Sequence, residues 1–280
     1  PNDARGKAES VLAILPLVSM LVVFGLFDGM TRRGEWKQFF AVFGALVSLT
    51  GVVSLFLVQD SPALKPRKDS RFRTLLYGLR PAVVRENPRL YLALAAFGVF
   101  SVAGQVFFPY LIIYMQSYLG FDNYAVVLGA VLIFASIVSV ALGGVIDRVG
   151  KLRFVLPAAG VMLLGLLGMY FVRGFVPVIA AGCVMMSGYM LVTAALSGAV
   201  RDHTPEGKAG HFQGIRMIFA VLLPMLIGPF IGSAVIRGSG RTYVELGEVK
   251  SVPTPGIFLA AAAVLLLILP PVLALRKRER

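Results

Sequence analysis

The dominant pattern in this chain is a series of long apolar stretches separated by short clusters of charged residues. A helix needs about 20 apolar residues to cross a bilayer. These stretches are apolar on every side, whereas the strands of a membrane barrel would alternate over segments of about ten residues. The pattern therefore predicts eight transmembrane helices, at residues 11–27, 39–58, 90–118, 124–146, 154–172, 175–199, 217–236 and 256–275.

Several prolines fall within these stretches, and they predict kinks or helix ends within the spans. A bilayer supplies no water to the backbone amides, so an irregular turn is tolerated only where neighbouring helices pack around it. The prolines concerned are Pro16, Pro109, Pro224, Pro229 and Pro270.

The composition agrees with an all-α polytopic membrane protein. Hydrophobic residues make up 58% of the 280 residues and charged residues 15%, whereas a soluble domain is about half apolar and a quarter charged. This balance argues against a soluble enzyme and against a disordered chain. The lone Cys183 argues against a disulfide-rich secreted module.

The formal net charge of +13 would suggest nucleic-acid binding in a soluble protein. Here 20 of the 27 basic residues fall on one side of the predicted membrane and seven on the other. The positive-inside rule makes the side with 20 cytoplasmic. We therefore expect a protein of the plasma (inner) membrane, embedded in the lipid bilayer, with both ends of this chain cytoplasmic and no nucleic-acid partner.

A basic stretch at residues 59–89 separates the first two predicted helices from the last six. It contains eight basic and three acidic residues. This predicts a division into 1–58, a cytoplasmic linker 59–89, and a six-helix bundle 90–280. Apolar residues from Phe72 to Val83 recur at helical spacing, which leaves two alternatives open: an amphipathic helix on the anionic inner leaflet, or a solvated basic linker.

A local motif joins two of the predicted helices on the cytoplasmic side. It comprises Gly143, Asp147, Arg148, Gly150 and Lys151. Gly143 would remove bulk where helices approach, Gly150 would permit a left-handed turn, and Asp147 would accept hydrogen bonds from a helix amino terminus. The alternative is that the loop is basic and glycine-rich only because it is short and cytoplasmic.

This motif resembles the signature loop of the major facilitator superfamily, which lies between the second and third helices of each six-helix half. Residues 90–118 would then be the family's seventh helix. Pro205 and Gly210 resemble a second family motif, which precedes the eleventh helix. Pro1 and Gly6 repeat its spacing 204 residues earlier, as two repeated halves predict.

The resemblance implies eight helices of a twelve-helix bundle. Residues 1–58 would hold the last two helices of the amino-terminal bundle, and residues 90–280 the complete carboxyl-terminal bundle. The first four helices would be missing. Since Pro1 is not an initiator Met, we interpret the chain as a fragment, with processing of a mature protein as the alternative.

Members of this family transport solutes by alternating access, in which two bundles rock about a central site. The resemblance implies that Asp147 faces the start of the family's fifth helix, at residues 7–11, and holds the inward side closed. Ala209 departs from the second motif, because an Arg often stands before its Gly, as Arg5 does in the first copy.

In this family the seventh and tenth helices line the substrate cavity. A polar side chain inside lipid is costly unless it faces protein or water, so Gln105 near mid-helix is the first candidate. The alternatives are hydrogen bonds between helices for Gln105 and Thr193, and an interfacial aromatic belt for the outer tyrosines. The candidate substrate-binding residues are Gln105, Tyr110, Tyr114, Gln116, Tyr189 and Thr193, with Ser187 nearby on the tenth helix.

The middle of every predicted span lacks Asp, Glu, Lys and Arg. This favours a neutral polar solute such as a sugar as the small-molecule substrate, and it places any residue coupled to a proton or sodium ion in the missing helices. The alternatives are an exporter of drug-like amphiphiles and a non-transporting sensor or lipid-handling protein. We expect no enzyme activity, cofactor or metal site, and a monomer.

Overall fold

The computed structural model describes residues 27, 29–30, 33–57, 80–205, 209–238, 240–245 and 247–279. It divides into two compact units, residues 1–69 and 70–280, which are described separately. Most of the first predicted span, with Pro16 and the residues from Lys7 to Val11, lies outside the described residues.

The first unit contains helix α3 (Trp36–Leu57), which matches the predicted span at residues 39–58. Its 22 residues include no Asp or Glu, and none of them is buried. Aromatic rings gather near its start, where the rings of Phe39 and Phe43 lie 4.7 Å apart. A helix that is apolar all round and not buried in protein is typical of a membrane span.

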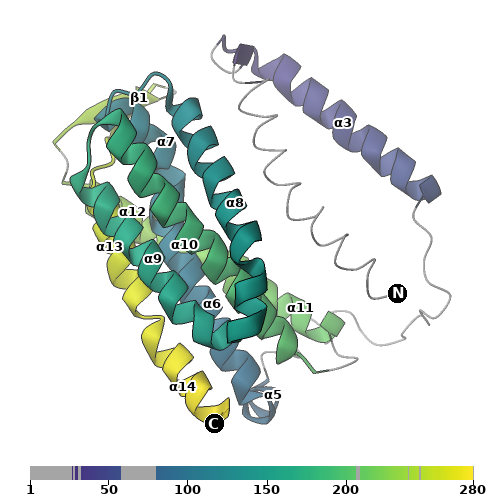
Figure 1. Ribbon diagram of the computed structural model, residues 1–280. Helices are drawn as coiled ribbons and strands as arrows, with labels where there is room; N and C mark the ends of the chain where they lie inside the picture. Colours follow the sequence, from purple (N-terminus) through teal and green to yellow (C-terminus); the bar gives the residue numbers. More distant parts are fainter. Residues whose placement is uncertain are drawn as a thin grey trace. The chain divides into compact units, whose positions relative to one another are not determined.

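The second unit is a helical bundle with α10 packed against both α9 and α8 (Figure 1). Apolar residues from all its long helices form the core, as expected for helices with apolar sides throughout. Its main helices are α5 (Pro81–Glu86), α6 (Pro88–Phe107), α8 (Tyr124–Val149), α9 (Lys151–Phe171), α10 (Phe175–Asp202), α11 (Ala209–Met217), α12 (Leu223–Ile236), α13 (Gly256–Leu266) and α14 (Leu269–Glu279).

Seven helical segments in the described part of the chain are long and apolar enough to cross a membrane. They correspond to seven of the eight predicted spans, so the all-α membrane fold is confirmed. The segments are Trp36–Leu57, Pro88–Tyr118, Tyr124–Ile146, Lys151–Phe171, Phe175–Asp202, Phe212–Ile236 and Gly256–Arg278.

Prolines lie at breaks in three of these spans, as predicted, and these are Pro109, Pro224 and Pro270, whereas α12 continues through Pro229. Pro109 lies in a 3-10 turn, η2 (Phe108–Tyr110), which is followed by α7 (Leu111–Ile113) and a π turn, η3 (Tyr114–Tyr118). Pro224 follows a second π turn, η4 (Ile218–Leu222). Because proline has no N–H to donate, it removes a helical hydrogen bond, which favours such irregular turns.

The last span consists of two helices, and the break lies beside Pro270, one of the prolines that predicted a kink or a helix end. Helix α13 ends at Leu266 and α14 begins at Leu269. The amides of Leu267 and Ile268 each bond the carbonyl three residues earlier, which tightens the chain. Pro270 in the first turn of α14 cannot continue the preceding helix.

Glycines bring two pairs of helices into backbone contact. A Cβ added at Gly165 in α9 would overlap the backbone of Met185 in α10, and one added at Gly188 in α10 would overlap the backbone of Met162. Between α6 and α12, a Cβ at Gly228 would overlap Gln105. Small residues allow this close approach in membrane bundles, where dispersion contacts replace the hydrophobic effect.

A short antiparallel hairpin between α12 and α13 was not predicted. Strands β1 (Thr242–Glu245) and β2 (Glu248–Ser251) pair with Thr242 opposite Ser251. Gly247 lies in the connecting turn with a φ of +82°, which glycine adopts without strain. The hairpin lies at the end of the bundle opposite to α5 and the carboxyl terminus (Figure 1).

Only the end of the predicted linker, from Arg80 onward, belongs to the described residues. It forms α5, in which Val83 is buried and belongs to an apolar cluster that also contains Leu90, Leu94 and Phe212. Most of the apolar repeat that begins at Phe72 lies outside the described residues, so the choice between an amphipathic helix and a solvated linker stays open.

Candidate functional site

The glycine motif forms a sharp reversal between α8 and α9. Helix α8 continues through Gly143, Asp147 and Arg148, and the chain turns at Gly150, where φ is +94°. Lys151 then begins α9. The expected turn at Gly150 is present, but the loop is a single residue, because the apolar helix extends further than its charges suggested.

The close helix approach expected at Gly143 is not seen among the described residues. An added Cβ at Gly143 would meet nothing within 4 Å, whereas one at Gly198 in α10 would lie 2.8 Å from the Cδ of Lys151. Gly198 therefore makes room for the lysine stem, a role that sequence reasoning did not assign. The Asp147 side chain lies outside the described residues.

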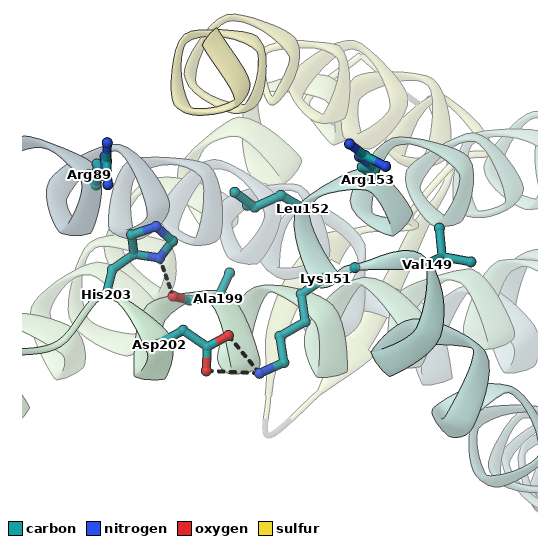
Figure 2. A pocket seen from close by; sticks show the side chains of 9 residues that line it. Arg89, Val149, Lys151, Leu152, Arg153, Ala199, Asp202 and His203 are labelled. Atoms are coloured by element: carbon teal, nitrogen blue, oxygen red, sulfur yellow. Dashed lines mark hydrogen bonds and ion pairs between the residues drawn. The ribbon is translucent and has the colours of Figure 1, made fainter. Parts of the chain in front are cut away.

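The Lys151 side chain lies over Gly198 and forms an ion pair with Asp202 at the end of α10. Its Nζ lies 2.6 Å from Oδ2 and 2.8 Å from Oδ1 of Asp202 (Figure 2). The two side chains are 29% and 51% exposed, so solvent screens the pair and it contributes at most about 1 kcal/mol to stability. The ion pair matters mainly because it connects the start of α9 to the end of α10.

An arginine from the carboxyl-terminal helix also contacts the start of α9. Arg276 donates from Nε and Nη2 to the carbonyl of Leu152, at 3.1 and 3.0 Å, and from Nη2 to the carbonyl of Arg153, at 2.8 Å. Arg89 at the start of α6 donates from Nη2 to the carbonyl of Arg278, at 2.7 Å. Helices α6, α9 and α14 are therefore linked at this end of the bundle.

A pocket of about 480 Å³ opens beside this turn. Figure 2 shows the Lys151–Asp202 ion pair on its wall, and His203 turned toward Ala199. The His203 Nδ1 lies 2.7 Å from the Ala199 carbonyl, which can only accept a hydrogen bond. The lining residues are Arg89, Val149, Gly150, Lys151, Leu152, Arg153, Ala199, Asp202 and His203.

Two of the candidate substrate residues lie at the contact between α6 and α12. The backbone and Cβ of Gln105 meet Gly228, and the ring of Tyr110 meets Gly232. The Tyr110 hydroxyl donates to the carbonyl of Pro229 at 2.9 Å. The Tyr110 hydroxyl therefore links the η2 turn to α12, whereas the Gln105 side chain is only half-buried.

Tyr114 has a different environment, because its side chain is fully buried. Its ring contacts Phe258 edge-on and stacks on Tyr118, with both centroid distances 5.2 Å. Among the described residues, the hydroxyls of Tyr114 and Ser187 are the buried side-chain groups that lack a hydrogen-bond partner. Buried polar groups without a partner are rare, and they commonly mark a water or ligand site.

The two candidates on α10 lie four residues apart. Tyr189 packs over Gly104, and its ring centroid lies 4.9 Å from that of Phe100 and 5.0 Å from that of Phe108. The Thr193 hydroxyl donates to the Tyr189 carbonyl at 2.8 Å, a bond within its own helix. Tyr189 therefore packs on the α6 face that carries Phe100 and Gly104, whereas the Thr193 hydroxyl is already occupied.

Gln116 is exposed in the π turn at the far end of the same span. Close by, the guanidinium carbons of Arg173 and Arg241 lie 5.7 and 5.6 Å from the centroid of Tyr118. Gln105 and Tyr110 therefore pack toward α12 and Tyr189 packs against α6, while Tyr114 and Gln116 lie further along the span. The structure does not gather all six candidates around one point.

Comparison with protein families identifies one match. The family model of the Major Facilitator Superfamily matches residues 1–229, which is most of the chain. A search of curated proteins found no match. The matched region includes the glycine turn and both helices that carry the substrate candidates. With its apolar helices and this match over more than half of its length, the chain belongs to the Major Facilitator Superfamily of membrane transporters.

Proposed function

We propose that this chain is part of a secondary transporter that moves a small, neutral, polar solute by alternating access. Family membership supports membrane transport. The neutrality of the solute rests on the spans, which carry no Asp, Glu, Lys or Arg at their centres. An anionic solute would require a buried Arg or Lys to compensate its charge.

The polarity of the solute rests on one observation, the partnerless hydroxyl of Tyr114. A buried hydroxyl without a partner costs about 1–3 kcal/mol. That cost is recovered when a solute hydroxyl or a water bonds it in another conformation of the transport cycle. Ser187 on α10 presents a second buried hydroxyl of the same kind, and the family's tenth helix lines the cavity.

The glycine motif supplies the proposed inward gate. The Lys151–Asp202 ion pair and the Arg276 hydrogen bonds hold the α8–α9 turn in position. A rigid turn would present Asp147, at the end of α8, to the amino-terminal half of the transporter. We propose that Asp147 there meets the helix start at residues 7–11, where exposed amides favour a negative charge.

We further propose that transport is coupled to a proton or sodium ion, and that the coupling carboxylate lies outside this chain. The same proposal places the protein in the plasma (inner) membrane as a monomer, with both ends of this chain cytoplasmic. The orientation rests on the distribution of basic residues, 20 against seven.

A second candidate is export of an aromatic or amphiphilic compound. Its support is the ring cluster formed by Phe100, Phe107, Phe108 and Tyr189 on α6 and α10. Phe100 and Phe107 are buried in this structure, so the rings would offer stacking surfaces to a flat apolar ligand in a conformation that separates the helices, with favoured centroid distances of about 4.5–7 Å. A sugar would also stack on them, so the substrate panel must contain both classes.

The test is solute uptake into proteoliposomes that contain the intact gene product of which this chain is part. The panel combines sugars, other neutral polar solutes and amphiphilic dyes, each with and without an imposed proton or sodium gradient. Flux of a polar solute that a gradient accelerates supports the proposal. Flux of dyes alone supports the exporter, and no flux of any solute favours a non-transporting sensor or lipid-handling protein.

The Tyr114→Phe variant tests the site within the same assay. Removal of the hydroxyl should reduce uptake of the polar solute several-fold, because one solute hydrogen bond is lost. Tyr170→Phe is the matched control, since it removes a hydroxyl from α9 outside the proposed cavity. Equal uptake by both variants would contradict the role of Tyr114.

A further inference from the structure

We propose that the pocket beside the α8–α9 turn binds a phosphate group, carried either by a lipid headgroup or by a soluble phosphate ester. This site lies at the end of the bundle, away from the residues proposed to contact the transported solute. The proposal concerns binding alone, and it stands whether or not the solute proposal holds.

The charge of the pocket favours an anion. Three of its lining residues, Arg89, Lys151 and Arg153, carry a positive charge, and Asp202 carries the one negative charge. Lys151 already neutralises that carboxylate through contacts of 2.6 and 2.8 Å. Arg89 and Arg153 therefore remain as a net charge of +2 facing a volume of about 480 Å³.

The two arginines also have donors to offer. A guanidinium has five N–H donors, and Arg89 uses its Nη2 group to bond the Arg278 carbonyl. The planar guanidinium group of an arginine can donate two parallel hydrogen bonds to two oxygens of one phosphate. His203 adds no donor in its neutral form, because its Nδ1 proton points to the Ala199 carbonyl.

The ends of α8, α9 and α10 border the pocket. Helix α9 has 21 residues, and Gly150 precedes it without a capping side chain. The amides of its first turn, at Lys151, Leu152 and Arg153, belong to residues that line the pocket. The amino terminus of α9 carries partial positive charge, whereas the carboxyl ends of α8 and α10, at Val149 and Asp202, carry partial negative charge. The preference for an anion therefore rests on the arginine side chains.

The site suits a membrane surface as well as a soluble ligand. Val149, Leu152 and Ala199 form an apolar part of the wall, against which the glycerol and first acyl carbons of a lipid would pack. Anionic lipids gather basic residues at the cytoplasmic leaflet. Because the phosphate chemistry is the same for both ligand sources, only experiment separates them.

The experiment is a binding titration of the intact gene product, purified in a neutral detergent at low salt. The probes are dihexanoyl phosphatidic acid, glycerol 3-phosphate, and dihexanoyl phosphatidylcholine as the zwitterionic reference. Calorimetry gives the dissociation constant for each. Preferential binding of the phosphatidic acid would identify a lipid headgroup, and equal binding of glycerol 3-phosphate would identify a soluble phosphate ester.

Variants locate the site. Replacing both arginines, by Arg89→Gln and Arg153→Gln, should raise the dissociation constant at least tenfold, which corresponds to about 1.4 kcal/mol. The matched control is Arg85→Gln, which removes one exposed charge from α5 at the same end of the bundle but outside the pocket. It should change the constant less than twofold.

Thermal unfolding without ligand checks that the double variant is folded. If the double variant does not fold, the single variant Arg153→Gln is used instead, because it retains the Arg153 carbonyl that accepts a hydrogen bond from Arg276. The dissociation constant of this variant should rise at least threefold. The proposal is overturned if neither phosphate probe binds more tightly than phosphatidylcholine. It is also overturned if Arg85→Gln weakens binding as much as the pocket variants do.

Discussion

Tyr110 and Tyr114 lie one helical turn apart in the same span, yet their hydroxyls have opposite environments. The first donates to the Pro229 carbonyl of α12 at 2.9 Å, and the second is buried without a partner. Residue type alone makes the two tyrosines equivalent candidates. The difference between them depends on which helix lies opposite each one.

This difference predicts opposite effects on stability. Tyr110→Phe should lower the free energy of unfolding by about 1 kcal/mol, because it removes a hydrogen bond between helices. Tyr114→Phe should leave it unchanged or raise it, because its hydroxyl bonds nothing in this structure. The measurement is denaturant unfolding in detergent micelles, and greater destabilisation by Tyr114→Phe would contradict the assignment.

At the scale of elements, α9 and α10 pack in close backbone contact. Gly165 and Gly188 meet the backbones of Met185 and Met162. Neither glycine stands out in the sequence, because the chain contains 30 glycines. Only the packing of the two helices shows which of them carry the contact.

Two glycines in the same helix test this contact. Gly165→Ala should destabilise the bundle by about 1–3 kcal/mol or more, because the added methyl group can fit only if the helix backbones separate. Gly160→Ala is the control in α9, since its Cβ would meet nothing within 4 Å. The control should be neutral or stabilising by up to about 1 kcal/mol, as alanine favours helix.

The readout is the thermal unfolding midpoint of each variant in the same detergent. Equal midpoints for the two variants would show that α9 and α10 do not pack through Gly165. A loss at Gly160 alone would point to a contact on the opposite face of α9.

At the scale of the whole chain, the asymmetry of basic residues predicts its orientation in the membrane. The end with the α8–α9 turn should face the cytoplasm, and the β1–β2 hairpin should face the other side. The ion pairs and hydrogen bonds at the turn do not decide this, because they would form equally well in either orientation.

Single cysteines test the orientation in intact cells. In a Cys183→Ser background, Glu248→Cys in the hairpin should react with a membrane-impermeant maleimide added outside. Arg148→Cys should react only after the membrane is permeabilised, because the positive-inside rule places it in the cytoplasm. Both positions are exposed in the structure, and the reverse labelling pattern would overturn the proposed orientation.

The sequence by itself determined the class of fold, the seven described spans and the sharp turn at Gly150. These features depend on properties that a chain carries locally: apolar length, which bilayer thickness sets, and a glycine where φ must be positive. The family motif could also be recognised from the sequence, because its residues are close together in the chain.

Only the tertiary structure decided the rest. It showed that Lys151 pairs with Asp202 across 51 residues, that Arg276 contacts the start of α9, and that Tyr114 lacks a partner. The hairpin also appeared only there. These features arise from contacts between helices, and in an apolar bundle the residues of every face look alike until their neighbours are known.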